Sequence, residues 1–264
     1  MATLGPVQSQ VYVDVVLGQI SIAYQDTKCI ADQIFPELLV SKRTGIYYVY
    51  DTSSQRVVND YRAPRTRAQE VEYGVTKASY GPLIEHALEQ AVEWEIESDY
   101  IAPLNPDIDA TNNLTRRLTL SKEVDAFNQA SNTAVVTQND TLSGSEQWND
   151  AGSNPINDIK VACDQVKLAT GAQVGDLTVV LGYPAYTALR NHASIIDRIK
   201  YSMVGVLTTD LLAQVFGVKR VIIGEATYNT ANQLQADSMS YIWGKNAWVM
   251  LITDNPAPRT MTFG

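Results

Sequence analysis

The sequence predicts an α+β fold in which an extended two-stranded segment and one long helix precede a compact α/β unit. Three observations lead to this prediction. Residues 45–80 contain strand-like stretches but few large aliphatic side chains. Residues 107–131 follow a helical apolar pattern. From residue 155 to residue 253, helix and strand patterns alternate, which is typical of an α/β unit.

The extended segment is predicted to be two strands with a long polar connection. Residues 45–50 and 71–80 are rich in β-branched and aromatic side chains, and residues 51–54 carry a turn signal. An isolated hairpin is only marginally stable in water. We therefore expect this segment to lie on its own body or on another subunit.

The long helix is predicted from an apolar stripe that covers about half of a helical wheel. Its 25 residues at ~1.5 Å each would span almost 40 Å. Two acids, Asp107 and Asp109, stand at the start, where the helix dipole favours negative charge. The stripe consists of Leu114, Leu118, Leu120, Ser121, Val124 and Phe127.

The α/β unit follows a polar linker at residues 132–154. Asn154 and Pro155 predict a helix start, and Gly171 predicts its end. Cys163 lies on the apolar stripe of this helix and is expected to be a small buried side chain. Further helices are expected at 184–192 and 209–216, and strands at 177–181, 220–224 and within 241–253.

Composition excludes several classes of protein. A net charge of −9 argues against a protein that grips a phosphate backbone. The two cysteines, Cys29 and Cys163, argue against a disulfide scaffold or a cysteine zinc module. The longest apolar run, residues 247–252, is too short to span a membrane, and the absence of basic residues before Lys28 predicts no signal peptide.

Charge is unevenly distributed along the chain. Residues 41–77 carry seven basic and four acidic side chains, whereas residues 85–109 carry eight acids and no Lys or Arg. One segment could lie over the other, within a subunit or between neighbours, or each could be a separately solvated surface. Seven of the 14 tyrosines fall between Tyr47 and Tyr100, which favours either an interface or strand packing.

Catalytic and metal motifs are weak. His86 and His192 are the two histidines, and no Gly-x-Ser-x-Gly motif occurs. His86 and Glu89 would share one face of a helix, which is a weak metal pair. Residues 107–118 begin like a calcium loop but lack its Gly and final Glu. We therefore predict no catalytic residue, no cofactor and no metal.

Short sequence segments along nearly the whole chain occur in an order that is also found in a known protein family. They lie at 31–36, 40–48, 80–85, 148–150, 154–159, 177–182, 188–189, 196–198, 221–224, 226–229 and 242–244. In this order they resemble the major capsid protein of tailed bacteriophages, which has the Hong Kong 97-like fold. The resemblance implies an N-terminal arm, an extended loop, a peripheral domain with a spine helix, an axial domain and a return strand, at 1–40, 41–84, 85–135, 136–256 and 257–264 respectively. Members usually continue with strands that complete the peripheral domain, so this branch is short or the chain is partial.

The function implied by the resemblance is structural. The chain would self-assemble as pentamers and hexamers into an icosahedral head shell around double-stranded DNA, without sequence-specific DNA binding, catalysis or membrane contact. Portal, scaffolding and decoration proteins would be its other partners. It would be made in the bacterial cytoplasm and reside in the virion.

Inter-subunit contacts are predicted from the charge distribution. Arg62, Arg65 and Arg67 are expected to meet Glu93, Glu95 and Glu97 of an adjacent subunit, with Tyr48 and Tyr50 in the same interface. Two alternatives stay open at this point. One is an encapsulin-type compartment shell with the same fold. The other is a small-molecule-binding α/β domain with its ligand at the carboxyl ends of strands such as 177–181.

Overall fold

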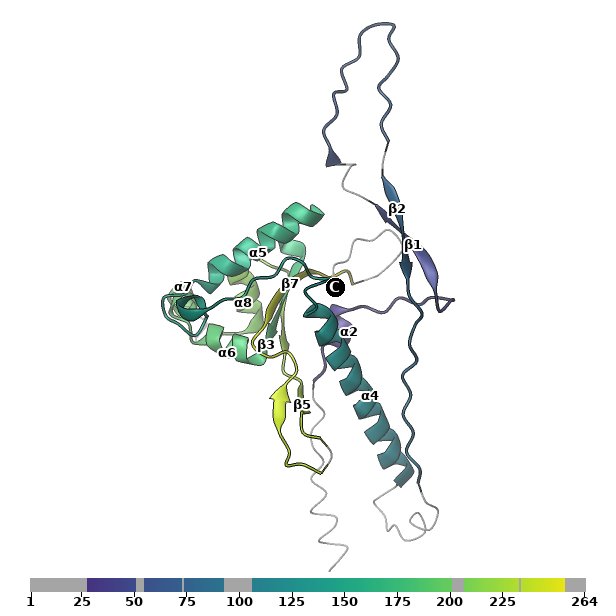
Figure 1. Ribbon diagram of the computed structural model, residues 1–264. Coiled ribbons are helices and arrows are strands. Elements are labelled where there is room, and N and C mark those ends of the chain that lie inside the picture. Colours follow the sequence, from purple (N-terminus) through teal and green to yellow (C-terminus); the bar gives the residue numbers. More distant parts are fainter. Residues whose placement is uncertain are drawn as a thin grey trace, which may run out of the picture. The chain divides into compact units, whose positions relative to one another are not determined.

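Helices and strands are mixed in the computed structural model, as predicted (Figure 1). The structure describes residues 28–50, 55–72, 74–92, 106–200, 207–232 and 234–254. Residues 38–87 form one compact unit, and the remainder of the chain forms a second, larger unit. The two units are described separately below, as the hairpin unit and the body.

The body is built on a three-stranded sheet with the order β4–β3–β7. Its central strand β3 (Leu177–Gly182) pairs in parallel with β4 (Arg220–Gly224) and antiparallel with β7 (Ala247–Leu251). Every residue of β3 is buried, because the strand is covered on both faces. A continuous apolar run such as LTVVLG is typical of a strand in this position.

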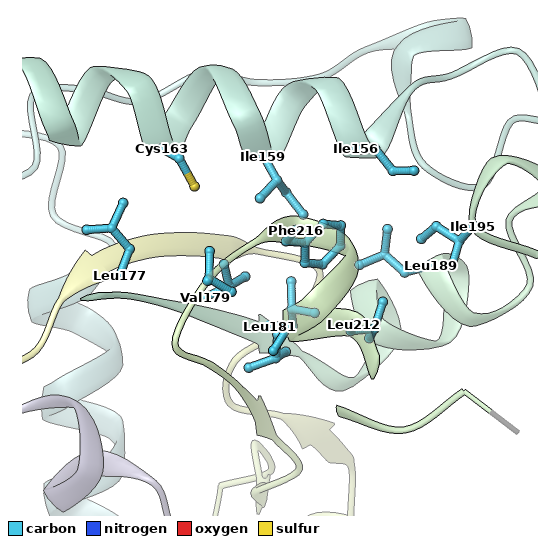
Figure 2. Close-up of a cluster of buried hydrophobic side chains, with 13 residues drawn as sticks. Ile156, Ile159, Cys163, Leu177, Val179, Leu181, Leu189, Ile195, Leu212 and Phe216 are labelled. Atoms are coloured by element: carbon cyan, nitrogen blue, oxygen red, sulfur yellow. The ribbon is translucent and has the colours of Figure 1, made fainter. Parts of the chain in front are cut away.

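Four helices cover one face of this sheet: α5 (Pro155–Thr170), α6 (Tyr183–Arg190), α7 (Ala193–Ile199) and α8 (Thr209–Phe216). Figure 2 shows Cys163 and Ile159 of α5 pointing toward the side of β3 that carries Leu177 and Val179. These strand residues alternate with residues of the opposite face, as the period of two requires. This packing forms the first of two core clusters.

Local signals fix the ends of α5 as the sequence predicts. The Asn154 side chain accepts a hydrogen bond from the Asn157 backbone N–H, at 3.3 Å, and Pro155 is the first helical residue. Gly171 ends the helix with a φ of 73°, a left-handed conformation that favours glycine. Cys163 is 2% exposed, so its prediction as a buried apolar side chain is confirmed.

The other face of the sheet packs against α2 (Ala31–Ile34) and the C-terminal half of α4 (Pro106–Ala130). The predicted long helix is confirmed in α4. Of its predicted stripe, Leu120, Val124 and Phe127 reach the second core cluster. They pack there with residues of the sheet, of α2 and its N-cap, and of the turn before β7, namely Ile30, Ile34, Val180, Ile222, Trp243 and Met250.

Parts of the body differ from the prediction, whereas the final strand agrees with it. The helix expected at 184–192 is two helices, because His192 begins α7 as its N-cap. The final strand, expected within 241–253, is confirmed as β7 at 247–251. A small hairpin of β5 (Thr227–Asn229) and β6 (Met239–Tyr241) was not predicted, and the polar segments contain short 3-10 helices at η2 (Gly144–Glu146) and η3 (Val174–Asp176).

The hairpin unit contains an antiparallel pair, β1 (Gly45–Tyr50) and β2 (Val75–Tyr80). The first strand agrees with the prediction, and the second begins later than the predicted residue 71. The described residues 55–72 between the strands contain no strand. The unit is therefore a short ladder that carries a long irregular excursion.

Candidate functional site

Both faces of the β1–β2 ladder are open to solvent within the hairpin unit. Opposite residues share a face in an antiparallel pair, so Tyr48 lies beside Lys77 and Tyr50 lies beside Val75 on one face. Tyr48 is 60% exposed and Tyr50 is 48% exposed. Tyr47, on the opposite face, is also exposed. The ladder therefore has no core of its own.

Large apolar side chains continue beyond the ladder. Further exposed members of the hairpin unit are Ile46 within the ladder and Leu39, Val57, Tyr61, Val71 and Ile84 outside it. Several large exposed apolar side chains in one unit indicate an interaction surface, because burying them on a partner removes apolar area from water. This surface is the first candidate functional site.

A tight turn lies inside the excursion. The Thr66 backbone N–H and hydroxyl both donate to the Ala63 carbonyl oxygen, at 3.2 and 2.7 Å. Pro64 precedes Arg65, whose φ is 64°. A positive φ at the third position, after proline, is the pattern of a type II turn, where glycine is the usual residue. Arginine at this position is strained, because a side chain disfavours positive φ.

The three predicted arginines are brought together by this turn. Arg62, Arg65 and Arg67 flank or form it, and all three are exposed. Arg67 makes only a 4.0 Å contact with Glu70, and both side chains are largely in solvent. The predicted acidic partners Glu93, Glu95 and Glu97 lie outside the described residues, so their contact with the arginines stays a prediction.

A buried carboxylate in the body was missed by the sequence analysis. Glu123 of α4 is 0% exposed, and both of its oxygens accept hydrogen bonds. Oε2 accepts from the backbone N–H groups of Ala31 at 2.8 Å and Ile30 at 3.0 Å. Oε1 accepts from the Trp243 indole N–H at 2.6 Å. The available signal was an acid on the same helix side as Leu120, Val124 and Phe127.

Two exposed lysines of the body form ion pairs. Lys122 contacts Asp32 and Glu37, and the hydrogen bond to Asp32, followed by that to Glu37, raises the pKa of Lys122. A second pair joins Lys219 to Asp254 at 2.6 Å, and the hydrogen bond from Lys219 lowers the pKa of Asp254. These side chains are substantially exposed, so each pair contributes little to stability on its own.

His192 is buried, and its hydrogen bonds give it a structural role. Its Nδ1 accepts from the Ser194 backbone N–H at 3.2 Å, which assigns the proton to Nε2. Nε2 then donates to the Asp150 carbonyl oxygen at 3.1 Å. The hydroxyl of Ser153 lies 3.1 Å from Nε2 but donates to the same carbonyl, at 2.8 Å. In this tautomer His192 is not a base for Ser153.

The structure also tests the weak metal-ligand pair suggested by the sequence. His86 and Glu89 would share a face only in a helix, and they lie in a stretch without helix, so this condition is not met. Among the residues that the structure describes, no three His, Cys, Asp or Glu side chains are grouped as metal ligands. Burial raises the pKa of the Cys163 thiol, which keeps it protonated and unreactive.

One polar hollow of about 310 Å³ lies in the body, away from the carboxyl ends of β3 and β4. Asp140, Glu146, Ser153, Asn154 and Asp158 line it. Its Asp158 carboxylate already accepts a hydrogen bond from the Trp148 indole at 2.9 Å. In the described part of the chain, no helix is both long and apolar enough to cross a bilayer.

Comparison with known families decides between the functional alternatives. Residues 130–264 match the family model of phage major capsid protein E. This chain belongs to that family. The capsid protein is 29% identical over 234 residues to the major capsid protein of Burkholderia phage BcepMu, which covers 89% of this chain and 74% of the relative. It is also 29% identical over 242 residues to the major capsid protein of Pseudomonas phage JBD67, covering 89% and 75%.

Solved structures show the same fold. A phage-related protein from Bordetella bronchiseptica RB50 superposes with a TM-score of 0.67 at 23% identity, over 95% of this capsid protein and 81% of that chain. The capsid of Cyanophage P-SCSP1u gives a TM-score of 0.51 at 10% identity, over 87% and 74%. The predicted role as a phage major capsid protein, a structural subunit that forms a shell, is confirmed. The encapsulin alternative is thereby set aside.

Proposed function

We propose that this capsid protein assembles as pentamers and hexamers into an icosahedral head shell of the Hong Kong 97-like type around double-stranded DNA. The exposure of both faces of the β1–β2 ladder carries the proposal. Burying such a surface against a partner is favourable. In a shell built of repeated subunits, this partner is a second copy of the chain. The hairpin unit is thus the part of the chain that docks on a neighbouring subunit.

The domain assignment belongs to the same proposal. Residues 1–40 would be the arm, 41–84 the extended loop, 85–135 the peripheral domain, 136–256 the axial domain and 257–264 the return strand. Residues 38–87 form a compact unit of their own, which supports the assignment of 41–84 as the extended loop. The last segment lies outside the described residues.

One face of the ladder is the better docking face. Ile46, Tyr48, Tyr50 and Val75 are all exposed on it. On the opposite face, Ala78 and Tyr80 are already half-buried. Tyrosine suits such an interface, because it offers a large apolar ring at low entropic cost and a hydroxyl that tolerates water.

The arginine turn supplies the charged part of the interface. We propose that Arg62, Arg65 and Arg67 contact Glu93, Glu95 and Glu97 of the neighbouring subunit. The positive φ of Arg65 supports this proposal, since a glycine would hold the turn without strain and the arginine side chain must therefore have a use. Opposite charges across an interface fix its register more than they raise its affinity.

The contents of the shell are consistent with the charge of the chain. A net charge of −9 disfavours tight binding to a DNA backbone, so packaged DNA would not be held by the wall. Portal, scaffolding and decoration proteins are proposed as further partners on the family resemblance alone. Synthesis in the host cytoplasm and residence in the virion follow from the same role.

A triple charge reversal tests the interface. The variant R62E/R65E/R67E is expected to fold, because the three side chains are exposed, and to form few or no closed shells in electron micrographs. The matched control K160E/K167E/R198E makes the same charge change at exposed positions of α5 and α7, and should assemble. Normal shells from the arginine variant would overturn the proposed contact.

A compensating variant identifies the partner residues. If the arginines meet the three acids, then adding E93R/E95R/E97R to the reversed chain should restore shells, since the charges are again opposite. Failure of this rescue, with both parent variants folded, would show that other acids receive the arginines. Nuclease-resistant DNA in shells isolated from infected cells tests the enclosed genome separately.

A further inference from the structure

The segment of residues 28–37, here called the strap, is fastened to α4 by one buried carboxylate. Glu123 Oε2 accepts hydrogen bonds from the backbone N–H groups of Ile30 and Ala31. These groups stand at the start of α2, where backbone N–H groups have no partner within a helix. The strap also buries the side chains of Ile30 and Ile34 in the second core cluster.

The other carboxylate oxygen anchors the same residue to the rest of the body. Oε1 accepts from the indole of Trp243, a fully buried ring. Trp243 packs edge-to-face against Phe127 and Trp248, with ring centroids 5.9 and 5.2 Å apart. The position of Glu123 is therefore set by the aromatic cluster, and the strap is set by Glu123.

The chemistry of the partners selects a carboxylate. The hydrogen-bond partners of Glu123 are three N–H groups, from Ile30, Ala31 and Trp243, and a carboxylate is an acceptor at both oxygens. An amide at this position would turn an NH₂ donor toward one of those donors. A leucine would leave all three N–H groups buried without an acceptor, which is costly.

The strap occupies a special place in the chain. It joins residues 1–27 to the hairpin unit, which begins at Leu38. The ion pairs of Lys122 with Asp32 and Glu37 hold its outer side, but these side chains are mostly in solvent. Ile30 and Ile34 add apolar burial, and Arg220 donates to the Gln33 carbonyl oxygen at 3.3 Å, but the buried polar contact between the strap and α4 is made by Glu123.

We propose that Glu123 is a positioning residue for shell assembly: it fixes the point from which the hairpin unit leaves the body. The inference rests on the proposed docking of that unit on a second copy of the chain. A strap that detaches withdraws Ile30 and Ile34 from the second core cluster and lets the hairpin unit start from a variable position. Assembly would then cost more conformational entropy, because the hairpin unit would no longer start from a fixed position.

The test compares E123Q with D125N, the same carboxylate-to-amide change at an exposed position of the same helix. In E123Q we expect the fraction of detached strap to rise about tenfold, as the loss of one charge-assisted hydrogen bond implies. Trypsin cleavage after Lys28 reports detachment, and cleavage after Lys42 and Arg43 in the hairpin unit is the internal reference. Shell yield should fall in E123Q and not in D125N, while the far-ultraviolet circular dichroism of both variants is unchanged.

The outcomes separate this inference from the proposed function. If wild-type protein and D125N form shells and E123Q forms them equally well, Glu123 is not a positioning residue. If R62E/R65E/R67E also assembles normally, the proposed docking of the hairpin unit through these arginines is wrong.

A measurement on the unmodified chain guards against a variant that does not fold. Hydrogen exchange of the Ile30 and Ala31 amides should be slow, within about tenfold of the β3 amides, because Glu123 protects them. Exchange at the rate of an exposed chain would show that the strap is not fastened in solution and would overturn the inference.

Discussion

Trp243 lies so close to Gly224 that no side-chain atom fits between them. A Cβ atom on Gly224, the last residue of β4, would collide with the Cβ, Cγ and Cδ1 atoms of Trp243. Gly182, its register partner at the end of β3, would collide with the backbone of Trp243 and Gly244. Two adjacent strands thus end in glycine because the turn that carries Trp243 crosses directly over them.

Substituting Gly224 by Ala should therefore destabilise the body. We expect the free energy of unfolding to fall by about 1–3 kcal/mol, the usual cost of overpacking a core that cannot relax. Urea denaturation measures it. The control is Gly175→Ala, where an added Cβ meets no atom within 4 Å. An equal loss in both variants would mean that the Trp243 contact is not the cause.

The tyrosine face gives a prediction that separates folding from assembly. Y48A/Y50A should change the free energy of unfolding by no more than about 0.5 kcal/mol, because both side chains are exposed in the subunit. The protein concentration needed for shells should rise about tenfold or more, if these rings anchor the interface. Light scattering against concentration measures it.

The matched control for that experiment is Leu168→Ala. Leu168 is 85% exposed on α5, so this change removes a comparable exposed apolar group from the body. Its assembly threshold should match that of the wild type. A threshold unchanged in Y48A/Y50A would contradict the assignment of this face as the docking face.

The ion pairs of Lys122 predict a pH dependence of stability at the alkaline end. Hydrogen bonds to Asp32 and Glu37 raise the pKa of Lys122 above its ordinary value of 10.5. A group whose pKa is raised on folding stabilises the protein below its unfolded pKa, and this stabilisation is lost as pH rises through the folded pKa. The contribution is therefore constant near neutrality and disappears above 10.5.

Thermal unfolding of wild type and Lys122→Met measures this dependence. We expect a small difference in melting temperature between them from pH 7 to pH 9, below what ~1 kcal/mol would produce, since the pair is exposed. The difference should shrink in 1 M salt and above pH 10.5. A difference that grows with pH would have the wrong sign.

Sequence reasoning succeeded where short-range signals decide the structure. The cap at Asn154 and the left-handed Gly171 bound α5, and Gly217 ends α8 with a φ of 74°. The continuous apolar run of β3 predicted a strand covered on both faces. These signals lie within a few residues of the element that they define, so one sequence is enough to find them.

The same reasoning failed where contacts are distant in sequence. Glu123 meets Ile30 and Trp243, 93 and 120 residues away, and the one local signal is its place on the apolar side of α4, which does not reveal its partners. The extra helix α7 depends on the His192 side chain acting as an N-cap, which is an uncommon cap. The exposure of the hairpin unit could be predicted because a missing core is visible in composition alone, whereas its docking on a neighbour stays a prediction.

The contact of Ile30, Glu123 and Trp243 has a consequence for synthesis. Its last member is made 213 residues after its first. At ~5–20 residues per second, a bacterial ribosome needs roughly 10–40 s to cover that distance. During this interval the first residues of the nascent chain have no finished site to bind. Unfinished chains therefore carry a strap that is not yet held in place. Only a chain translated past Trp243 can hold the start of the hairpin unit in its final position.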